Sequence, residues 1–301
     1  MATRMYIDGI DVLTSYGAYP TELGGFLEWP SLKEVKTYDW PDEDGVDADL
    51  THPVLASRQF MISIAVKNGL ISRFVDFICG QSTRIYEIPE LNYTKQLRMV
   101  GCSDFNTMGD MGFVNITLSD DSPFSGYEYH KPSTNTHSPN SEGVLTIDGI
   151  DITSYGCVAL QGVADSMKAF ERVKEALAIN VSNIAGVRYD NDSPVYNAPH
   201  SIVIPLLMRA GSINEFWQNY YALIYDLTRP RDREIVYKGG IFHSVFYNSQ
   251  SIEEISMPRY NGDSIWVKFT ITFTTFASSF ILSSEDSEAI VDENNEYYIK
   301  L

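Results

Sequence analysis

Hydrophobic and polar positions alternate along much of this chain, in runs that predict β-strands separated by turns. At 112–118 the even positions from 114 are aliphatic and positions 115 and 117 are polar, which is typical of a half-buried strand. The run 60–66 is apolar at nearly every position, which favours a strand buried on both faces. The pattern predicts further strands at 5–7, 11–16, 83–88 and 96–102.

One helix interrupts these strands. Apolar residues at 70–78 recur with a helical period, and Gly80 is well placed to end the helix. The second half repeats the order, with a strand at 202–208, a helix from 212 and strands at 234–237, 241–247 and 265–276. Ser212 and Glu215 form a capping box, and Pro230 terminates the helical pattern. Pro205 predicts that its strand lies at an edge or carries a bulge.

Two further segments of the second half have helical spacing. The insert 165–178 predicts an additional helix. On the helix from 212, Phe216, Trp217, Tyr220 and Tyr221 form an aromatic face. Such a face serves either as a ligand platform or as a core surface, and the helical spacing favours core packing.

A short motif occurs twice. Residues 7–17 are IDGIDVLTSYG and residues 147–156 are IDGIDITSYG. Gly45-Val46 likewise recurs as Gly186-Val187. The two copies start 140 residues apart, at positions 7 and 147. That spacing has the size of a domain, so the simplest explanation is one fold, duplicated and fused. The motif residues common to both copies are Asp8, Gly9, Tyr16, Gly17, Asp148, Gly149, Tyr155 and Gly156.

The pattern therefore predicts a mainly β chain with one flanking helix per domain, an α+β arrangement. We expect a first domain at 1–127, a polar linker at 128–144, a second domain at 145–280 and an acidic tail or terminal strand at 281–301. The length of 301 residues and the 44% hydrophobic content agree with two domains that each have a core.

The net charge of −18 disfavours stable adhesion to nucleic acid, which needs a basic surface. The charge either maintains solubility or repels DNA that must slide past. Cys79, Cys102 and Cys157 are odd in number and include no CxxC pair, which predicts buried free thiols and a reducing cytoplasm. The N-terminus shows no signal-peptide pattern, and we expect no membrane insertion.

The sequence contains no phosphate-binding loop, nucleophile elbow or HExxH motif, and its five histidines are scattered. We therefore expect no enzyme, no cofactor and no metal site. The acidic run 42–49 fails as a calcium loop, because Gly45 at position 6 would place Trp40 at position 1. A solvated turn is the simpler interpretation. Beyond that, Asp44, Gly45, Asp47 and Asp49 are predicted to form an inter-subunit loop.

Taken in order, these features resemble the phage distal tail protein family over residues 5–125. They are the IDGIDVLTSYG opening, the Asp-Gly loop with Asp49 and Thr51, the strand at 60–66, the helix, and a closing strand followed by Asp120-Asp-Ser-Pro-Phe124. Over 146–276 only the opening motif and the order of elements match. Many members carry a lectin-like C-terminal domain, whereas this second half looks like another copy of the first.

The resemblance implies two tandem tail-tube-like β-sandwich or barrel domains. It further implies a structural virion protein, a distal tail or baseplate hub component that forms a ring continuing the tail channel. Its partners would be further copies of itself in a hexamer or trimer, the neighbouring tail tube and tail-tip proteins, and DNA as passing cargo. It would fold in the bacterial host cytoplasm and reside in the virion tail.

Two alternatives remain open on the sequence. A tail tube subunit of a long-tailed phage would share the scaffold. A glycan-binding adhesin module would instead use exposed loop aromatics, for which Tyr127, Tyr129 and Tyr260 are candidates.

Overall fold

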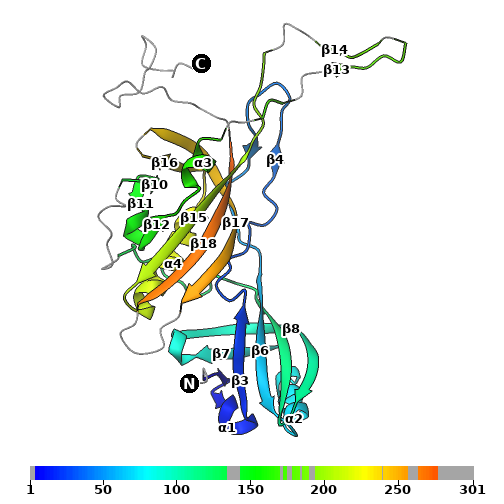
Figure 1. Ribbon diagram of the computed structural model, residues 1–301, viewed down its shortest axis with the longest axis vertical. Helices are drawn as coiled ribbons and strands as arrows, with labels where there is room; N and C mark the ends of the chain where they lie inside the picture. Colours follow the sequence, from blue (N-terminus) through cyan, green and yellow to red (C-terminus); the bar gives the residue numbers. More distant parts are fainter. Residues whose placement is uncertain are drawn as a thin grey trace. The chain divides into compact units, whose positions relative to one another are not determined.

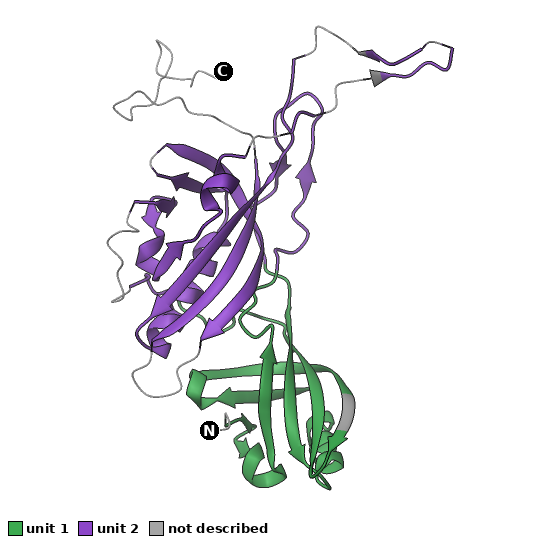
Figure 2. Cartoon of the chain, viewed as in Figure 1, with its two compact units in different colours: residues 1–30, 55–128 green, residues 31–54, 129–301 purple. Residues whose placement is uncertain are grey.

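The computed structural model describes residues 4–133, 143–169, 172–174, 178–183, 185–189, 194–238, 240–256 and 264–276 (Figure 1). The chain forms two compact units, coloured separately in Figure 2. Unit 1 comprises residues 1–30 and 55–128, and unit 2 comprises residues 31–54 and 129–301. Each unit contains one seven-stranded antiparallel sheet. The predicted mainly β fold with few helices is confirmed.

Unit 1 has the strand order β2-β1-β7-β8-β9-β6-β3. Its elements in chain order are β1 (Tyr6–Ile7), β2 (Ile10–Asp11), α1 (Val12–Tyr16), β3 (Ala18–Gly24), β6 (Arg58–Lys67), α2 (Ile71–Cys79), β7 (Thr83–Ile88), the 3₁₀ turn η1 (Pro89–Leu91), β8 (Tyr93–Met108) and β9 (Met111–Asp120).

Unit 2 has the strand order β11-β10-β16-β17-β18-β15-β12, which matches unit 1 strand for strand. Its elements are β10 (Leu145–Ile147), β11 (Ile150–Asp151), the 3₁₀ turn η3 (Ile152–Tyr155), β12 (Cys157–Ala159), α3 (Val163–Met167), β15 (Ser201–Ala210), α4 (Ile213–Leu227), β16 (Arg233–Tyr237), β17 (Ile241–Ser256) and β18 (Ile265–Thr275). The short sequence motif therefore marks the duplication of a whole sheet topology.

The strand register fixes which residues correspond between the repeats. Ala18 follows Gly17 and pairs with Val66, whereas Cys157 follows Gly156 and pairs with Met208. Position 66 thus corresponds to position 208, a difference of 142 residues, and the same difference relates the rest of β6 to β15.

The next strands extend this correspondence. Position 59 on β6 pairs with Ser119, and position 201 on β15 pairs with Thr274. On the far side, Arg98 pairs with Ser119 and Phe246 pairs with Thr274. Arg98 of unit 1 therefore occupies the position of Phe246 in unit 2.

Each repeat also carries a long excursion with a two-stranded sheet. The first holds β4 (Thr37–Tyr38) and β5 (Asp47–Ala48), and the second holds β13 (Ala178–Ile179) and β14 (Arg188–Tyr189). The paired residues differ by 141 in every case, as do Gly45 and Gly186. We call residues 31–54 the first arm and residues 172–195 the second arm. Both arms belong to unit 2.

The helix α4 packs on its own sheet through aromatic side chains. Phe216 and Tyr220 are fully buried, and the ring of Tyr220 lies 5.9 Å from that of Phe269 on β18. Trp217 and Tyr221 are half-buried beside them. The aromatic face is thus part of the core, because seating these rings against the sheet removes a large apolar area from water.

Some expected elements differ in the structure. Gln59 and Met61 on β6 are exposed, so this strand alternates over its first half instead of being buried on both faces. The helix expected at 165–178 ends at Met167, and Val173 forms an isolated bridge with Asn197. Residues 170–171 and 175–177 of that expected helix lie outside the described residues.

Pro205 lies within an interior strand, not at an edge. The neighbouring strand β12 is short and pairs only with residues 206–208. The missing N–H therefore falls just beyond that ladder, while the Pro205 carbonyl accepts a hydrogen bond from Leu160 N at 3.0 Å.

The start of the predicted linker packs on α4. Tyr129 donates to Asp226 at 3.1 Å, Ser133 N donates to the Asn219 side chain at 2.9 Å, and Gln218 donates to the Lys131 carbonyl. Residues 134–142, Tyr260 and the predicted tail at 281–301 lie outside the described residues. The first arm, which the sequence assigns to the first domain, groups with unit 2.

Candidate functional site

The first copy of the repeated motif begins with a tight turn at Asp8, whose φ is 52°. Its carboxylate accepts a hydrogen bond from Ile85 N at 2.9 Å and pairs with the Arg84 guanidinium. Arg84 is buried and also donates to the carbonyls of Phe77 and Ile78, at the end of α2. One ion pair thereby ties the opening turn to β7 and closes the C-terminus of the helix.

The second copy builds the same arrangement. Asp148 has a φ of 51°, accepts from Glu234 N at 2.9 Å and pairs with Arg233 at 2.6 Å. Arg233 is buried and donates to carbonyls at the end of α4 and after it, among them that of Pro230 at 2.6 Å. The two arginines did not stand out in the sequence, since a lone basic residue at a strand start is typical of a solvated position.

The motif continues with a capped turn. The Asp11 carboxylate accepts from Leu13 N and Thr14 N, which begins α1, and Gly17 ends it with a left-handed φ of 60°. These hydrogen bonds lower the pKa of Asp11, although the partial burial of this carboxyl raises it. The Tyr16 ring then stacks on Phe77, with ring centroids 5.2 Å apart.

In the second copy, Asp151 accepts from Thr153 N at 2.8 Å and Gly156 again has a left-handed φ of 73°. Tyr155 is fully buried and donates to Asp226 at 2.7 Å. Burial and that carboxylate raise the Tyr155 pKa far above its usual range. The motif residues thus serve turns, caps and packing, and Gly9 and Gly149 adopt the left-handed conformation of the turns.

The predicted inter-subunit loop lies on the first arm, within unit 2. Gly45 N donates to the Asn197 carbonyl at 2.7 Å, and Asn197 N donates to the Asp44 carboxylate at 2.7 Å. Lys174 pairs with Asp39 and donates to the Trp40 carbonyl. The acidic loop therefore binds the base of the second arm in the same chain, a contact that local sequence does not reveal.

The other two residues of this loop have local roles. Asp47 belongs to β5 and pairs with Tyr38. The Asp49 carboxylate accepts from Thr51 N at 3.1 Å, and hydrogen bonds from Thr51 lower the pKa of this exposed carboxyl. Whether the loop also meets another subunit stays a prediction.

The first arm is anchored by apolar side chains. Val46 and Leu50 are buried against Phe246 of β17, and Leu32, Val35, Ala48 and Phe276 pack around them. The rings of Phe246 and Phe276 lie 5.3 Å apart. Leu50 also accepts a backbone hydrogen bond from Arg231 N at 3.1 Å. Burying these aliphatic groups supplies the main attraction that holds the arm, at about 25 cal/mol per Å².

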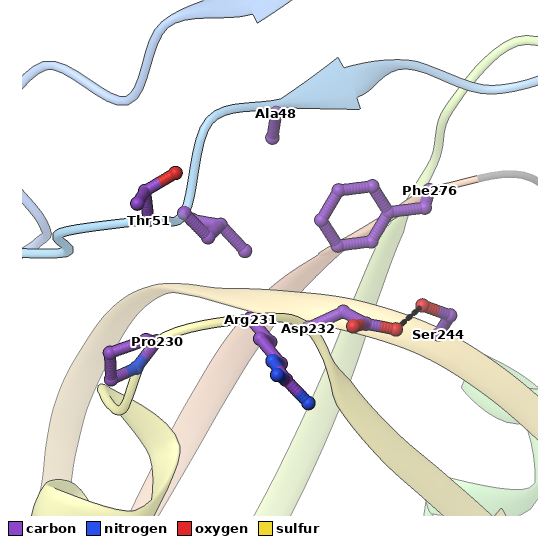
Figure 3. Close-up of a pocket in the computed structure, with 8 residues that line it drawn as sticks. Ala48, Thr51, Pro230, Arg231, Asp232, Ser244 and Phe276 are labelled. Carbon is purple, nitrogen blue, oxygen red and sulfur yellow. Dashed lines mark hydrogen bonds between the residues drawn. The ribbon is translucent and has the colours of Figure 1, made fainter.

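An open pocket lies beside this contact (Figure 3). Its lining residues are Ala48, Leu50, Thr51, Pro230, Arg231, Asp232, Ser244 and Phe276. Ser244 donates to the Asp232 carboxylate, as the dashed line in Figure 3 indicates. Arg231 and Asp232 are the ionisable groups in this lining.

A buried charged cluster in unit 1 was not predicted. Arg58 and Lys95 both contact Asp120, at 3.0 and 3.1 Å, and the Arg58 guanidinium lies 5.2 Å from the Trp29 ring centre. Burial lowers the Lys95 pKa, although Asp120 opposes that change. By the register, the matching residues of unit 2 form a different group, which consists of His200, Thr275 and His243.

The remaining candidates carry little chemistry. Among the described residues, no group of three or more His, Cys, Asp or Glu side chains is arranged to hold a metal ion. The expectation of buried thiols holds for Cys157, whereas Cys79 is exposed at the end of α2 and Cys102 is half-buried. Of the tyrosines considered for glycan binding, Tyr129 is 42% exposed, with its hydroxyl bonded to Asp226.

In the described part of the chain, no helix has the length and apolar character needed to cross a membrane.

Comparison with known proteins finds a similar solved structure but no similar sequence. No family model and no curated protein matches this sequence. The chain is similar to the crystal structure of SPP1 Dit, which is described as a paradigm of the hub adsorption apparatus in phages that infect Gram-positive bacteria. The match covers 91% of this chain and 98% of the other, at 14% identity and a TM-score of 0.32. At that TM-score, whole-chain superposition does not establish a common fold.

Proposed function

We propose that this chain is a structural component of a phage tail, a distal tail or baseplate hub protein that acts by assembly. The observation that carries the proposal is the arm of the first repeat, which lies in the unit built by the second repeat. A fold that packs an extended segment onto its own copy within one chain has the contact needed to join further copies. The order of elements that resembles the distal tail family supports the same role.

The acidic charge fits this role. A ring that passes DNA must not retain it, and phosphate contacts to Lys and Arg dominate DNA affinity. The chain has 22 basic and 40 acidic residues, so its overall field repels the DNA backbone.

The test is the assembly state. Light scattering and negative-stain microscopy of the purified protein should reveal closed rings. Long tubes instead of single rings would favour a tail tube subunit. Monomers without rings, in a protein that is also absent from purified virions, would refute the proposal. Binding on a glycan array would redirect it to an adhesin.

A further inference from the structure

The first arm carries a pair of exposed aromatic rings. Tyr38 on β4 is 52% exposed, and Trp40, two residues further on, is 50% exposed. Their ring centroids lie 6.4 Å apart, and the two ring planes are 13° from parallel. Single exposed apolar residues are common on protein surfaces, whereas adjacent Trp and Tyr side chains are typical of binding surfaces. The pair therefore marks a surface of the arm that can bind a partner.

Strand alternation places these rings on the side of the arm that faces away from the unit 2 core. Ala48 packs on the apolar cluster that anchors the arm, and Figure 3 shows it pointing from β5 into the pocket. Asp47 precedes Ala48 in the strand, so its side chain points to the opposite side. Tyr38 is the cross-strand partner of Asp47 and shares that side. We call Tyr38, Trp40 and Asp47 the outer face of the first arm.

The outer face lies in an acidic stretch. Residues 37–49 contain six carboxylate side chains and no lysine or arginine. Among them, Asp42, Glu43 and Asp47 are exposed. A cation over the face of a Trp or Tyr ring is attracted by the ring electrons, and an arginine guanidinium can also pair with a neighbouring carboxylate. Aromatic rings beside carboxylates therefore fit an arginine side chain, whereas a neutral sugar would gain no attraction from the charge.

Hydrogen bonds within the chain hold the backbone of this stretch in place. Lys174, whose side chain is 8% exposed, donates to the Trp40 carbonyl at 2.7 Å and pairs with Asp39. The Asp44 carboxylate accepts a hydrogen bond from Asn197 N at 2.7 Å. A stretch that is already fixed loses little conformational freedom when a partner binds. The outer face is thus arranged for binding before a partner arrives.

The second arm shows that the two-stranded ribbon does not require these side chains. Its strands pair Ile179 with Arg188, at the positions of Tyr38 and Asp47 in the first arm. The same ladder therefore forms without an aromatic ring and with the opposite charge. Pairing within the ribbon does not explain the aromatic and acidic side chains of the first arm, and binding is the role that fits them.

We propose that the outer face of the first arm binds arginine side chains on a different protein of the tail. The guanidinium lies against the rings of Tyr38 and Trp40 and pairs with the Asp47 carboxylate. Another copy of this chain fits less well, because it has 22 basic and 40 acidic residues. This inference rests on the proposed function only for the partner being a tail protein, and it adds the chemistry of the partner and the contact.

Short peptides of known charge test the contact on the purified protein. The probes are dye-labelled tetrapeptides of arginine, of lysine and of glutamine, and fluorescence anisotropy measures their dissociation constants. The ring variant is Tyr38→Ala with Trp40→Ala. Its matched control is Ile85→Ala with Met108→Ala, which removes apolar side chains that are 48% and 77% exposed in unit 1.

Two further variants separate charge from ring contact. Asp47→Asn removes the carboxylate of the outer face, and Asp110→Asn makes the same change in charge at an exposed position in unit 1. Tyr38→Phe with Trp40→Phe keeps an aromatic ring at both positions. All variants should melt within a few degrees of the unaltered chain, because every altered side chain is exposed.

We expect the arginine peptide to bind several-fold more tightly than the lysine peptide of equal charge, because a guanidinium stacks on an aromatic face. The glutamine peptide should not bind. The ring variant should bind the arginine peptide about tenfold more weakly, since two exposed cation–π contacts are lost. Asp47→Asn should weaken binding several-fold. Both controls and the phenylalanine variant should bind like the unaltered chain.

Equal affinity for the arginine and lysine peptides, or a ring variant that binds like its control, would overturn the inference and leave the proposed ring untouched. Loss of ring assembly in the ring variant but not in its control would also overturn it, because the outer face would then join copies of this chain. Arginine-selective binding at the outer face of a protein that forms no rings would support the contact and count against the proposed function.

Discussion

At the scale of single residues, the repeated motif shows how much a short sequence specifies. Asp8 and Asp148 each form a turn with a positive φ and each pair with a buried arginine of the same sheet. The turn could be predicted from Asp-Gly. The arginine could not, because Arg84 lies 76 residues away from its partner and nothing local marks it as buried.

Removing one partner of this ion pair should destabilise unit 2. For Asp148→Ala we expect a loss of about 2–4 kcal/mol in the free energy of unfolding, because buried Arg233 loses its counter-charge. Asp165→Ala, on the exposed first turn of α3, is the control and should cost under about 0.5 kcal/mol. Urea denaturation measures both, and equal losses would contradict the role of Asp148.

Two glycines with positive φ should differ in their tolerance of a side chain. A Cβ at Gly17 would lie 2.8 Å from the Lys67 Cβ, whereas at Gly9 it would meet open space. Both Gly→Ala changes force alanine into the left-handed conformation, which costs about 1–2 kcal/mol. Gly17→Ala should therefore lower the melting temperature clearly more than Gly9→Ala. Equal decreases in melting temperature would show that β6 moves at Lys67 to accommodate the added methyl group at no further cost in stability.

Asp121 should remain ionised in acid. Hydrogen bonds from Arg98 and Ser119 lower its pKa to about 2. A lowered folded-state pKa stabilises the fold above the ordinary carboxyl value near 4, and that stabilisation is lost as the pH falls toward 2. Carbon-13 NMR titration of the carboxyl should give a midpoint near 2 in the unaltered chain and a higher one in Arg98→Ala. An unchanged midpoint would mean that the ion pair does not form in solution.

At the scale of elements, the long strands and the helices α2 and α4 followed from periodicity. The prediction of a strand at 11–16 was wrong, because Asp11 caps the helix α1 there, and the arms were not predicted. Strand β7 was predicted with its observed bounds, and α2 was placed within one residue. The run 42–49 of the first arm looked like a solvated turn, since most of its side chains are carboxylates. Its partner Phe246 lies about 200 residues further along the chain, and no local pattern reports such a contact.

The acidic loop of this arm is still predicted to reach another subunit. Replacing Asp44, Asp47 and Asp49 with Ala should disturb assembly more than it lowers the melting temperature of the monomer. The Asp44 carboxylate accepts a hydrogen bond from Asn197 N within the same chain. The single variant Asp44→Ala therefore measures the effect of losing that internal contact alone. Light scattering paired with thermal melting makes the comparison. Normal assembly of the triple variant would contradict the prediction.

At the scale of the whole molecule, the duplication could be predicted from the motif and from the order of elements. The identical strand order in the two sheets could not, because antiparallel neighbours such as β1 and β7 are joined by long-range pairing. The division into units also departs from a simple cut of the chain, because the first arm crosses from one repeat to the unit of the other.

Removing the first arm, which belongs to the first repeat in the sequence, should therefore lower the stability of unit 2. Lys33 N donates to the Val54 carbonyl at 2.7 Å, so the ends of the arm are close enough to be joined by a short Gly-Ser linker. Calorimetry of the shortened chain should show a lower melting temperature for unit 2, because Phe246 and Phe276 lose their apolar cover. Unit 1 should melt as before. A loss confined to unit 1 would contradict this.

The first arm comes from one repeat and packs in the unit of the other, and this has a consequence for dividing the gene. A gene cut between codons 128 and 129 would yield two polypeptides. The shorter one would expose the apolar side chains of the first arm, and the longer one would carry the surface on which they pack. Produced together in one cell, the halves would recognise each other without a covalent tether. The contact that joins them would be the packing of Val46 and Leu50 against Phe246.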